Sequence, residues 1–277
     1  MDTWHKEITH CIHCESEEFN SIGHTSFGYQ RYECGDCHRT FNERSNTPFN
    51  RLEIQTDIAL QVVRWYLQYK LSLRDLTEIF FERGIIFSHE TARNWINKFT
   101  PLIIKELRRR RYGKAGESWY IDETIVRVKG TECYLYRAID RQGNLVDSML
   151  SEKRDMKSAK QFLKGTKKVT GRSPKRATTD GLASYPRAIR ENLGKRVLHR
   201  VNSYLINYTE QSHRPLKQRY YPMRGFGEFH SAAMICRGFE EIRNFFLPKY
   251  KNSLSLKERR RILASKLFSF KKMIAVF

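Results

Sequence analysis

The sequence has 277 residues, 40% of them hydrophobic, which suffices for one catalytic domain of ordinary size with one or two small modules. It contains no run of about eighteen apolar residues, and residues 1–5 lack a signal-peptide pattern, so we expect a cytoplasmic protein without a membrane span. The formal net charge of +21 indicates a polyanionic partner, first of all nucleic acid, with a ribosome-associated or merely basic surface as the alternative.

The charge is unevenly distributed along the chain. Residues 1–50 hold 4 Lys/Arg and 8 Asp/Glu, whereas residues 116–277 hold 34 and 15. We therefore expect the polyanion on the middle and C-terminal parts. Together with the motifs below, this predicts four segments: a zinc ribbon (1–50), a helix-turn-helix domain (51–112), a catalytic domain (113–250) and a basic tail (251–277), for which one amphipathic helix is predicted.

Two CxxC pairs, separated by 19 residues, lie near the start of the chain. Each pair presents two thiolates from one tight turn, and two such turns form a tetrahedral zinc site that can hold together a segment too small for its own core. A redox pair or a disulfide is less expected in a cytosolic protein, and His10, His13 and His38 are possible substitute ligands. The predicted zinc ligands are Cys11, Cys14, Cys34 and Cys37.

Residues 54–100 have apolar residues at helical spacing, which predicts three helices with breaks near residues 70–72 and 83–84. Ser88 is the expected N-cap of the third helix. This layout is typical of a helix-turn-helix unit, although a plain three-helix packing module is the alternative. The third helix is expected to end near Thr100 and to present a donor-rich face to DNA. That face consists of His89, Glu90, Arg93, Asn94, Asn97 and Lys98.

Arg108–Arg111 form a basic run before the glycines at 113 and 116. We interpret it as a linker that can lie along phosphates, with a solvated charge run as the alternative. From residue 118 the alternation changes to that of strands, at 118–128, 132–140 and 144–150, and helices and short strands then alternate. Three antiparallel strands followed by this alternation predict an α/β fold, a ribonuclease-H-like mixed sheet with flanking helices.

Three carboxylates stand out by position in this predicted fold. Asp122 lies in the middle of an apolar strand, where a charge is costly unless it binds something. Asp180 follows a strand, at the end where open α/β sheets bind ligands, and Glu210 lies on the helix beyond the next strand. Isolated Asp residues at strand ends are often caps, and Glu123, Asp140 and Asp155 are competing candidates. Glu210 alternatively pairs with Arg214 on the same helix.

Converging carboxylates need a cation to stay ionised together, and ligation by oxygen alone favours Mg²⁺ or Mn²⁺. Two such ions, roughly 3.5 to 4 Å apart, activate an attacking water or 3′-hydroxyl and stabilise the leaving oxygen in displacement at phosphorus. The predicted chemistry is therefore metal-dependent cleavage and joining of phosphodiester bonds.

The segments around these carboxylates closely resemble the integrase-core signature of insertion-sequence transposases, and the nearest group is the insertion sequence six family. The similarity covers about residues 54–246, and several motifs occur in the family's order. The matching segments are 119–124, 134–140, 151–155, 179–181 with 185–186, 210–214 with 217, and 222–226, together with 63–66 and 72–76 in the helical part.

The resemblance implies that Asp122, Asp180 and Glu210 are the metal-binding catalytic triad and that Lys217 contacts DNA near the scissile phosphate. His213 and Arg214 match as well, with roles in helix packing, phosphate contact or catalysis left open. Two departures are the short segment of 29 residues between Asp180 and Glu210, and Ser212 where an Asp is common.

The sequence thus predicts a DDE transposase, named for its Asp-Asp-Glu triad. We expect it to bind the terminal inverted repeats of an insertion sequence and to transfer the cut ends to target DNA. It would work as a homodimer or larger assembly on double-stranded DNA, in the nucleoid of a bacterium or archaeon. The alternatives are a catalytically decayed or domesticated DNA-binding protein, and a ribonuclease-H-like nuclease without transposition.

Overall fold

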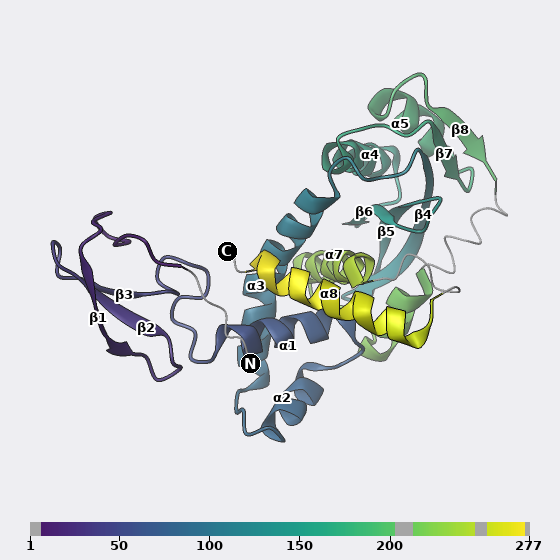
Figure 1. Cartoon of the computed structure of the whole chain (residues 1–277). Coiled ribbons are helices and arrows are strands. Elements are labelled where there is room, and N and C mark those ends of the chain that lie inside the picture. Colours follow the sequence, from purple (N-terminus) through teal and green to yellow (C-terminus); the bar gives the residue numbers. More distant parts are fainter. Residues whose placement is uncertain (1–6, 203–212, 247–253, 275–277) are drawn as a thin grey trace.

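The computed structural model describes residues 7–202, 213–246 and 254–274. In chain order, a small three-stranded sheet is followed by three helices and then by a five-stranded sheet with its own helices (Figure 1). In Figure 1 the small sheet lies at one side of the molecule, the helices α1, α3, α7 and α8 lie in the middle, and the larger sheet lies beyond them. The α/β fold class with a separate N-terminal cysteine module is confirmed.

The N-terminal sheet consists of β1 (Phe19–His24), β2 (Gln30–Cys34) and β3 (Thr40–Asn42), paired antiparallel in that order. Its core is small, with Cys11, Cys34 and Phe41 as its buried residues. Stacking of Tyr32 on Phe41, with ring centroids 5.7 Å apart, covers one side of the cysteines. A module with so little apolar surface needs additional cross-linking to stay folded.

The helical part contains α1 (Thr56–Gln68), α2 (Leu73–Phe81) and α3 (His89–Arg111), which confirms the three predicted helices. Ser88 caps α3 by accepting a hydrogen bond from the Thr91 backbone N–H at 3.1 Å, as predicted. The predicted end near Thr100 is wrong, since α3 continues through Pro101 to Arg111. The reason is that the apolar stripe of the helix continues beyond the proline, with Ile103, Ile104 and Leu107 all buried.

The larger sheet has the strand order β6-β5-β4-β7-β8, with β4, β5 and β6 antiparallel and β7 and β8 parallel to β4. This is the predicted ribonuclease-H-like arrangement. The strands are β4 (Ser118–Val128), β5 (Thr131–Asp140), β6 (Leu145–Ser151), β7 (Arg176–Thr179) and β8 (Leu198–Val201). The later helices are α4 (Met156–Thr170), α5 (Ser184–Asn192), η1 (Tyr221–Met223), α7 (Phe229–Phe246) and α8 (Leu256–Ile274).

Helices cover both faces of this sheet because its strands alternate two sets of apolar residues. Trp119 and Ile121 of β4 pack with α4 and α5, whereas Val126 and Val128 pack with α7 on the opposite face. Residues 213–220 are helical and lie on the α7 side, where Leu216 and Tyr220 join the same cluster. The predicted start of that helix, near residue 205, lies outside the described residues.

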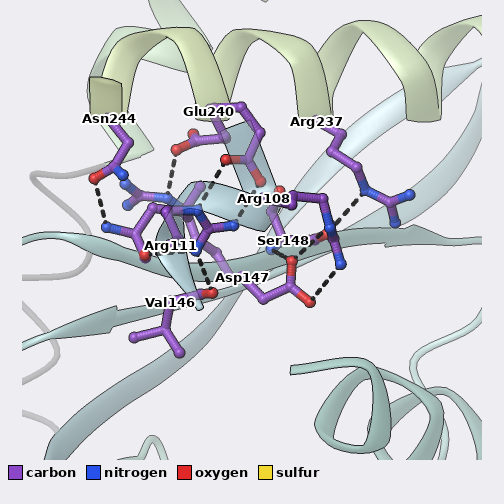
Figure 2. A network of polar contacts seen from close by, with 11 residues as sticks. Arg108, Arg111, Val146, Asp147, Ser148, Arg237, Glu240 and Asn244 are labelled. Carbon is purple, nitrogen blue, oxygen red and sulfur yellow. Dashed lines mark hydrogen bonds and ion pairs between the residues drawn. The ribbon is translucent and has the colours of Figure 1, made fainter. Parts of the chain in front are cut away.

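Ion pairs join the end of α3 to the larger sheet, where a linker was expected. The Arg108 guanidinium lies 2.9 Å from the Asp147 carboxylate of β6. Arg111 binds both oxygens of Glu241 of α7, at 2.6 and 3.0 Å, and also donates to two backbone carbonyls of β6. Figure 2 shows Arg108 and Arg111 pointing into the space between β6 and α7. The linker interpretation of Arg108–Arg111 is therefore wrong, because these arginines are helical and paired.

The predicted helix of the tail is present as α8, and its apolar side belongs to the core of the helical part. Phe270, Met273 and Ile274 are buried there, and the Phe270 ring lies 5.6 Å from that of Phe246 of α7. Among the helices of the described ranges, none combines the length and apolar character that crossing a membrane requires.

Candidate active site

The parallel pairing of β4 with β7 brings two of the predicted carboxylates together. Tyr120 lies opposite Thr178 in the register, so Asp122 and Asp180, each two residues further on, come side by side where β7 ends. Carboxylate oxygens of Asp122, Glu123 and Asp180 all lie within 4.8 Å of one another. Asp122 and Glu123 are adjacent in the sequence and Asp180 is distant from both. The three carboxylates thus form one cluster at the carboxyl end of β7.

Asp122 is only 8% exposed and faces the helix formed by residues 213–220. Its Oδ1 accepts a hydrogen bond from the Glu123 backbone N–H at 2.9 Å. Its Oδ2 lies 3.4 Å from Nε2 of His213, a ring that is 2% exposed and makes no hydrogen bond within the described ranges. The start of the described helix thus lies directly against the carboxylate.

Glu123 reaches the same cluster from the other face of the sheet. Its side chain is 2% exposed, and Oε1 accepts a hydrogen bond from the hydroxyl of Tyr185 of α5 at 2.6 Å. Burial raises the pKa of the Glu123 carboxyl, although the Tyr185 hydroxyl and the nearby guanidinium of Arg154 oppose the shift. Burial, and then Glu123 itself, raise the pKa of the Tyr185 hydroxyl well above its ordinary value, so Tyr185 remains a donor.

Arg154 supplies the positive charge of the cluster. Its Nη2 lies 2.9 Å from Oδ2 of Asp180 and 3.5 Å from Oε2 of Glu123. The backbone turns immediately after Asp180, since Gly181 has a φ of +96° and a Cβ there would lie 2.9 Å from Val201. That turn lets the Leu182 backbone N–H donate to Oδ1 of Asp180 at 3.1 Å. Asp180 is thus held from both sides while remaining accessible.

Two of the competing carboxylates have structural roles elsewhere. Asp140 accepts hydrogen bonds from the backbone N–H groups of Gly116, Gln142 and Asn144, and so shapes the β5–β6 turn. Asp155 is the N-cap of α4 and accepts from the Ser158 backbone N–H at 2.7 Å. Neither belongs to the cluster, whereas the third competitor, Glu123, does.

The third predicted carboxylate, Glu210, lies outside the described residues, as does Ser212. Of the other predicted residues in this segment, Arg214 is exposed, and Lys217 is half-buried one helical turn after His213. Lys217 therefore lies on the helix face that contacts Asp122, as a residue close to a bound phosphate would. Its contact with DNA stays a prediction.

The predicted DNA-reading face of α3 is exposed. Asn94, Asn97 and Lys98 face solvent, and Arg93 is exposed with an ion pair to Glu90 at 3.1 Å. The buried residues of the same stretch are Ala92, Trp95, Ile96 and Phe99. The helix therefore separates a packing face from a polar face, which is what groove recognition requires.

The four predicted zinc ligands lie together, with all Sγ atoms within 4.8 Å of one another. The Cys11–Cys37 and Cys14–Cys34 sulfur pairs are 3.7 and 3.5 Å apart. A tetrahedral zinc ion with bonds of about 2.3 Å requires sulfurs roughly 3.8 Å apart, so this donor set fits zinc. The backbone N–H of Cys37 contributes most to lowering the pKa of Cys34 to about 7, whereas hydrogen bonds with the other thiols, together with burial, raise the pKa of Cys14 to about 12. Cys34 is therefore the first of these thiols to ionise.

Sequence reasoning assigned no role to Arg154 and Tyr185, and named Glu123 only as a competitor. All three surround Asp180 and belong to segments quoted for the family resemblance, which was the available signal. Strand alternation placed Glu123 on the face away from Asp122. Glu123 reaches the cluster because its longer side chain extends beyond the end of β7 towards Tyr185.

Comparisons with known proteins identify this arrangement. A family model described as a DDE domain matches residues 116–248. The transposase for insertion sequence-like element IS431mec of Staphylococcus aureus (strain N315) is 36% identical over 175 residues, covering 62% of this chain and 77% of that protein. The transposase for insertion sequence element IS257 in transposon Tn4003, also from Staphylococcus aureus, is 35% identical over 175 residues with the same coverage.

Among solved structures, the HTLV-2 integrase catalytic core domain in complex with magnesium is 13% identical, with a TM-score of 0.36, and the match covers 54% of this chain and 98% of that one. The sequence relatives and the strand order carry the assignment, and they confirm the predicted resemblance. The chain therefore belongs to the DDE transposases of the insertion sequence six family.

Proposed function

We propose that Asp122, Asp180 and Glu210 are the catalytic triad of this transposase and that they cut and join DNA with Mg²⁺ or Mn²⁺. The observation that supports this most is the approach of Asp122 and Asp180, whose carboxylate oxygens lie within 4.8 Å of each other and of Glu123 at the end of β7. Glu210 is assigned to the triad from the family resemblance. A DDE transposase is a metal-dependent enzyme that cleaves DNA and transfers strands. The proposal concerns which residues of this chain carry that activity.

The donor set of the cluster suits a hard divalent cation. Three carboxylates face one another with a single guanidinium, that of Arg154, between two of them. Carboxylate oxygens without nitrogen or sulfur ligands favour Mg²⁺ or Mn²⁺. When bound, such ions lower the pKa of an attacking hydroxyl and stabilise the leaving oxygen of a phosphodiester.

The remaining residues of the site position these carboxylates and the DNA. His213 holds Asp122 from the helix side, and Tyr185 holds Glu123 from the α5 side. Arg154 keeps Asp180 and Glu123 together and is exposed enough to turn towards a phosphate. Lys217, and Arg214 beside it, are positioned to contact the backbone near the cut.

DNA recognition is assigned to α3, whose exposed Arg93, Asn94, Asn97 and Lys98 would contact the terminal inverted repeats. The second substrate is target duplex DNA. Because two element ends are joined to one target, the active species is a homodimer or a larger assembly, in the cytoplasm and on the nucleoid. Association with DNA will weaken steeply with salt, as expected for a protein of this net charge.

The catalytic assignment is tested on a duplex that carries the repeat flanking the gene, with Mn²⁺ present. Isosteric Asp122→Asn, Asp180→Asn and Glu210→Gln variants should each lose several kcal/mol of transition-state stabilisation, on the order of 10³-fold in cleavage rate. Each variant should still bind the duplex. Asp155→Asn is the matched control, because Asn also caps a helix well and that variant should cleave normally.

Cleavage that survives any one triad substitution removes that residue from the triad. Specific binding of the repeat by the natural protein, without cleavage under any divalent ion, would instead identify a decayed transposase that acts as a DNA-binding protein. Equal cleavage of duplexes with and without the repeat would indicate a nuclease.

We propose that the four cysteines hold one zinc ion that stabilises the N-terminal module. Metal analysis of the purified protein should find one zinc per chain. Cys34→Ser should lose it, whereas Cys133→Ala, which alters a buried thiol of the larger sheet, should retain it. Zinc retained by Cys34→Ser, or absent from the natural protein, would contradict the assignment.

A further inference from the structure

The exposed side of α8 carries five basic side chains: Lys257, Arg260, Arg261, Lys271 and Lys272. At 100° per residue, these five lie within about 120° of the helix circumference, which we call the α8 basic face. The opposite side holds Phe270, Met273 and Ile274, which are buried against α7 and the helical part. The last turns of the helix are thus fixed by their apolar side, and the basic side chains are exposed to solvent.

The basic face has no protein partner in the described ranges. None of its five side chains forms an ion pair there, in contrast to the arginines at the end of α3. The helix holds seven Lys or Arg and a single acidic residue, Glu258. Glu258 accepts hydrogen bonds from the Ser255 backbone N–H and hydroxyl at 2.8 and 2.7 Å, so it caps the helix.

The positions of these basic residues do not stabilise the helix. Cations near a helix N-terminus oppose the helix dipole, and Lys257 and Arg261 form a like-charged pair at i,i+4. Both effects are unfavourable in the isolated protein. Because no acidic side chain of the described chain offsets these unfavourable charges, we expect an external anionic partner to offset them.

We propose that the α8 basic face binds the sugar-phosphate backbone of duplex DNA, at a surface separate from the carboxylate cluster. From Lys257 to Lys272 the helix is roughly 22 Å long. A duplex of that length carries on the order of 13 phosphates, more than enough for five cations. Phe268, which is 71% exposed, lies among these cations and would be covered by the bound duplex.

The second half of α8 lies away from the cluster. Ser269 and Lys266 of α8 line a hollow together with Gln142 and Asn144 of the β5–β6 turn. That turn is at the amino end of β4, since Asp140 pairs with Trp119, whereas Asp180 follows the carboxyl end of β7. A duplex that runs along α8 to this end is therefore a second DNA segment, or a second stretch of the same one, beside that being cut.

A membrane surface fits less well, although the helix is basic and amphipathic. Interfacial helices insert a continuous apolar side between lipids. In the last turns of α8 that side is occupied by protein, because Phe270, Met273 and Ile274 pack against the core, and only Leu256 and Leu263 of the first half expose apolar surface there. DNA, which needs only the basic side, is the polyanion that matches the exposed surface, and this choice rests on the proposed function.

The test measures binding of a labelled 30-base-pair duplex without the repeat, by fluorescence anisotropy between 50 and 200 mM NaCl and without added Mg²⁺ or Mn²⁺. The variant combines Lys257→Gln, Arg260→Gln and Arg261→Gln. Three lost phosphate contacts should make the slope of log affinity against log salt less negative by about 2.7, so that over this range the natural protein loses about 40-fold more affinity than the variant.

The matched control combines Lys164→Gln, Lys167→Gln and Lys168→Gln on α4, which removes the same charge from another exposed helix. It should leave the slope unchanged. An unchanged slope in the α8 variant overturns the proposal, and so does an equal change in the control, which would indicate a net-charge effect. Normal DNA binding with lost binding to vesicles of phosphatidylcholine and phosphatidylserine would identify a membrane surface instead.

Failure of this proposal is distinguishable from failure of the proposed function. An α8 variant with an unchanged slope overturns the α8 assignment while the natural protein still cleaves the repeat duplex with Mn²⁺. Absence of that cleavage, with a reduced slope in the α8 variant, overturns the catalytic assignment and leaves the binding surface supported.

Discussion

The end of α3 and the exposed side of α8 are both rich in basic side chains, yet they differ in what faces the charge. Arg108 and Arg111 lie against Asp147 and Glu241, whose side chains are 4% and 0% exposed. On the α8 basic face, no acidic side chain lies within ion-pair distance in the described part of the chain. Two stretches of similar composition therefore have different physical roles.

The difference shows that a buried acidic partner, and not the run of basic residues itself, decides whether basic side chains stabilise the fold. A carboxylate inside the protein must be paired, so Arg111 compensates a charge that would otherwise be costly. An exposed cation on a helix adds little to the stability of its own chain. Its main favourable interaction is with an external polyanion. Substitutions on the two helices should separate these two cases.

Replacing Arg111 by Gln should destabilise the protein by about 3 to 5 kcal/mol, because Glu241 is left buried without its bidentate partner. Two backbone carbonyls of β6 also lose a donor. Urea denaturation of the natural and variant proteins measures this loss directly.

The matched control is Arg109→Gln, two residues earlier on α3, whose side chain is 72% exposed and pairs with Glu106. It should lose far less stability than Arg111→Gln, because an exposed ion pair is screened by solvent. Adding Glu241→Gln to Arg111→Gln should recover part of the larger loss, because the buried charge is then removed as well. Equal losses for Arg109→Gln and Arg111→Gln would mean that the pair with Glu241 is not a stabilising contact.

Arg154 is intermediate, since its side chain is 38% exposed but its partners belong to the active site. Arg154→Gln should lower the stability of the metal-free protein by about 1 kcal/mol, because Asp180 and Glu123 lose their counter-charge. Mn²⁺ should then bind roughly tenfold more tightly, a change of about 1.4 kcal/mol, since the guanidinium no longer competes for Asp180.

Thermal melting with increasing Mn²⁺ measures both quantities, because a ligand that binds the folded state raises its stability. Lys153→Gln removes the same charge from the neighbouring exposed residue and should change neither. Weaker Mn²⁺ binding in Arg154→Gln would show that the arginine assists the metal site, contrary to this prediction.

Much of the fold was predictable because its strands and helices carry clear local patterns. The alternation at 118–128 predicted β4 with the observed bounds, and the order of strands and helices predicted a ribonuclease-H-like mixed sheet. The same order predicted that Asp122 and Asp180 meet, since parallel strands end at the same side of a sheet. The cysteine spacing predicted the four-sulfur cluster.

What escaped prediction depends on tertiary partners. The extension of α3 past Pro101 follows from the burial of Ile103 and Leu107 against the rest of the core, which outweighs the proline. The pairing of Arg111 with Glu241 joins residues 130 positions apart, and nothing local signals it. Glu123 likewise enters the cluster through Tyr185, which lies on a different element.

A smaller, pH-dependent effect is expected at Glu106, which pairs with Arg109 and Arg110 on the same helix. The hydrogen bond from Arg109 contributes most to lowering the pKa of this carboxyl, and Arg110 adds to the shift. A lowered pKa in the folded state stabilises the protein above the unfolded value of about 4.3. That contribution is lost as the pH falls through the folded value.

Glu106→Gln should therefore lose about 0.5 to 1 kcal/mol at pH 7, the sum of two helix-surface pairs, and the difference should disappear near pH 3. Urea denaturation at the two pH values measures it. In an Arg109→Gln, Arg110→Gln background the substitution should have no effect, because the partners are gone. A difference that persists at pH 3 would contradict the electrostatic explanation.

The smallest effect should have the opposite sign and arises on α8. Replacing Lys257 and Arg261 by Gln should raise stability by a few tenths of a kcal/mol, because it removes a like-charged i,i+4 pair from the positive end of the helix dipole. Replacing Lys271 and Lys272, which lie in the last turn, should lower stability slightly, since cations are favourable there.

Both changes remove two positive charges from one helix, so a net-charge effect would give them the same sign, and both should shrink in 0.5 M salt as the charges are screened. Opposite signs would show that the cations at the start of α8 are unfavourable to the free protein. Their retention would then require the phosphates of a bound duplex, in contrast to the arginines of α3, whose partners lie within the fold.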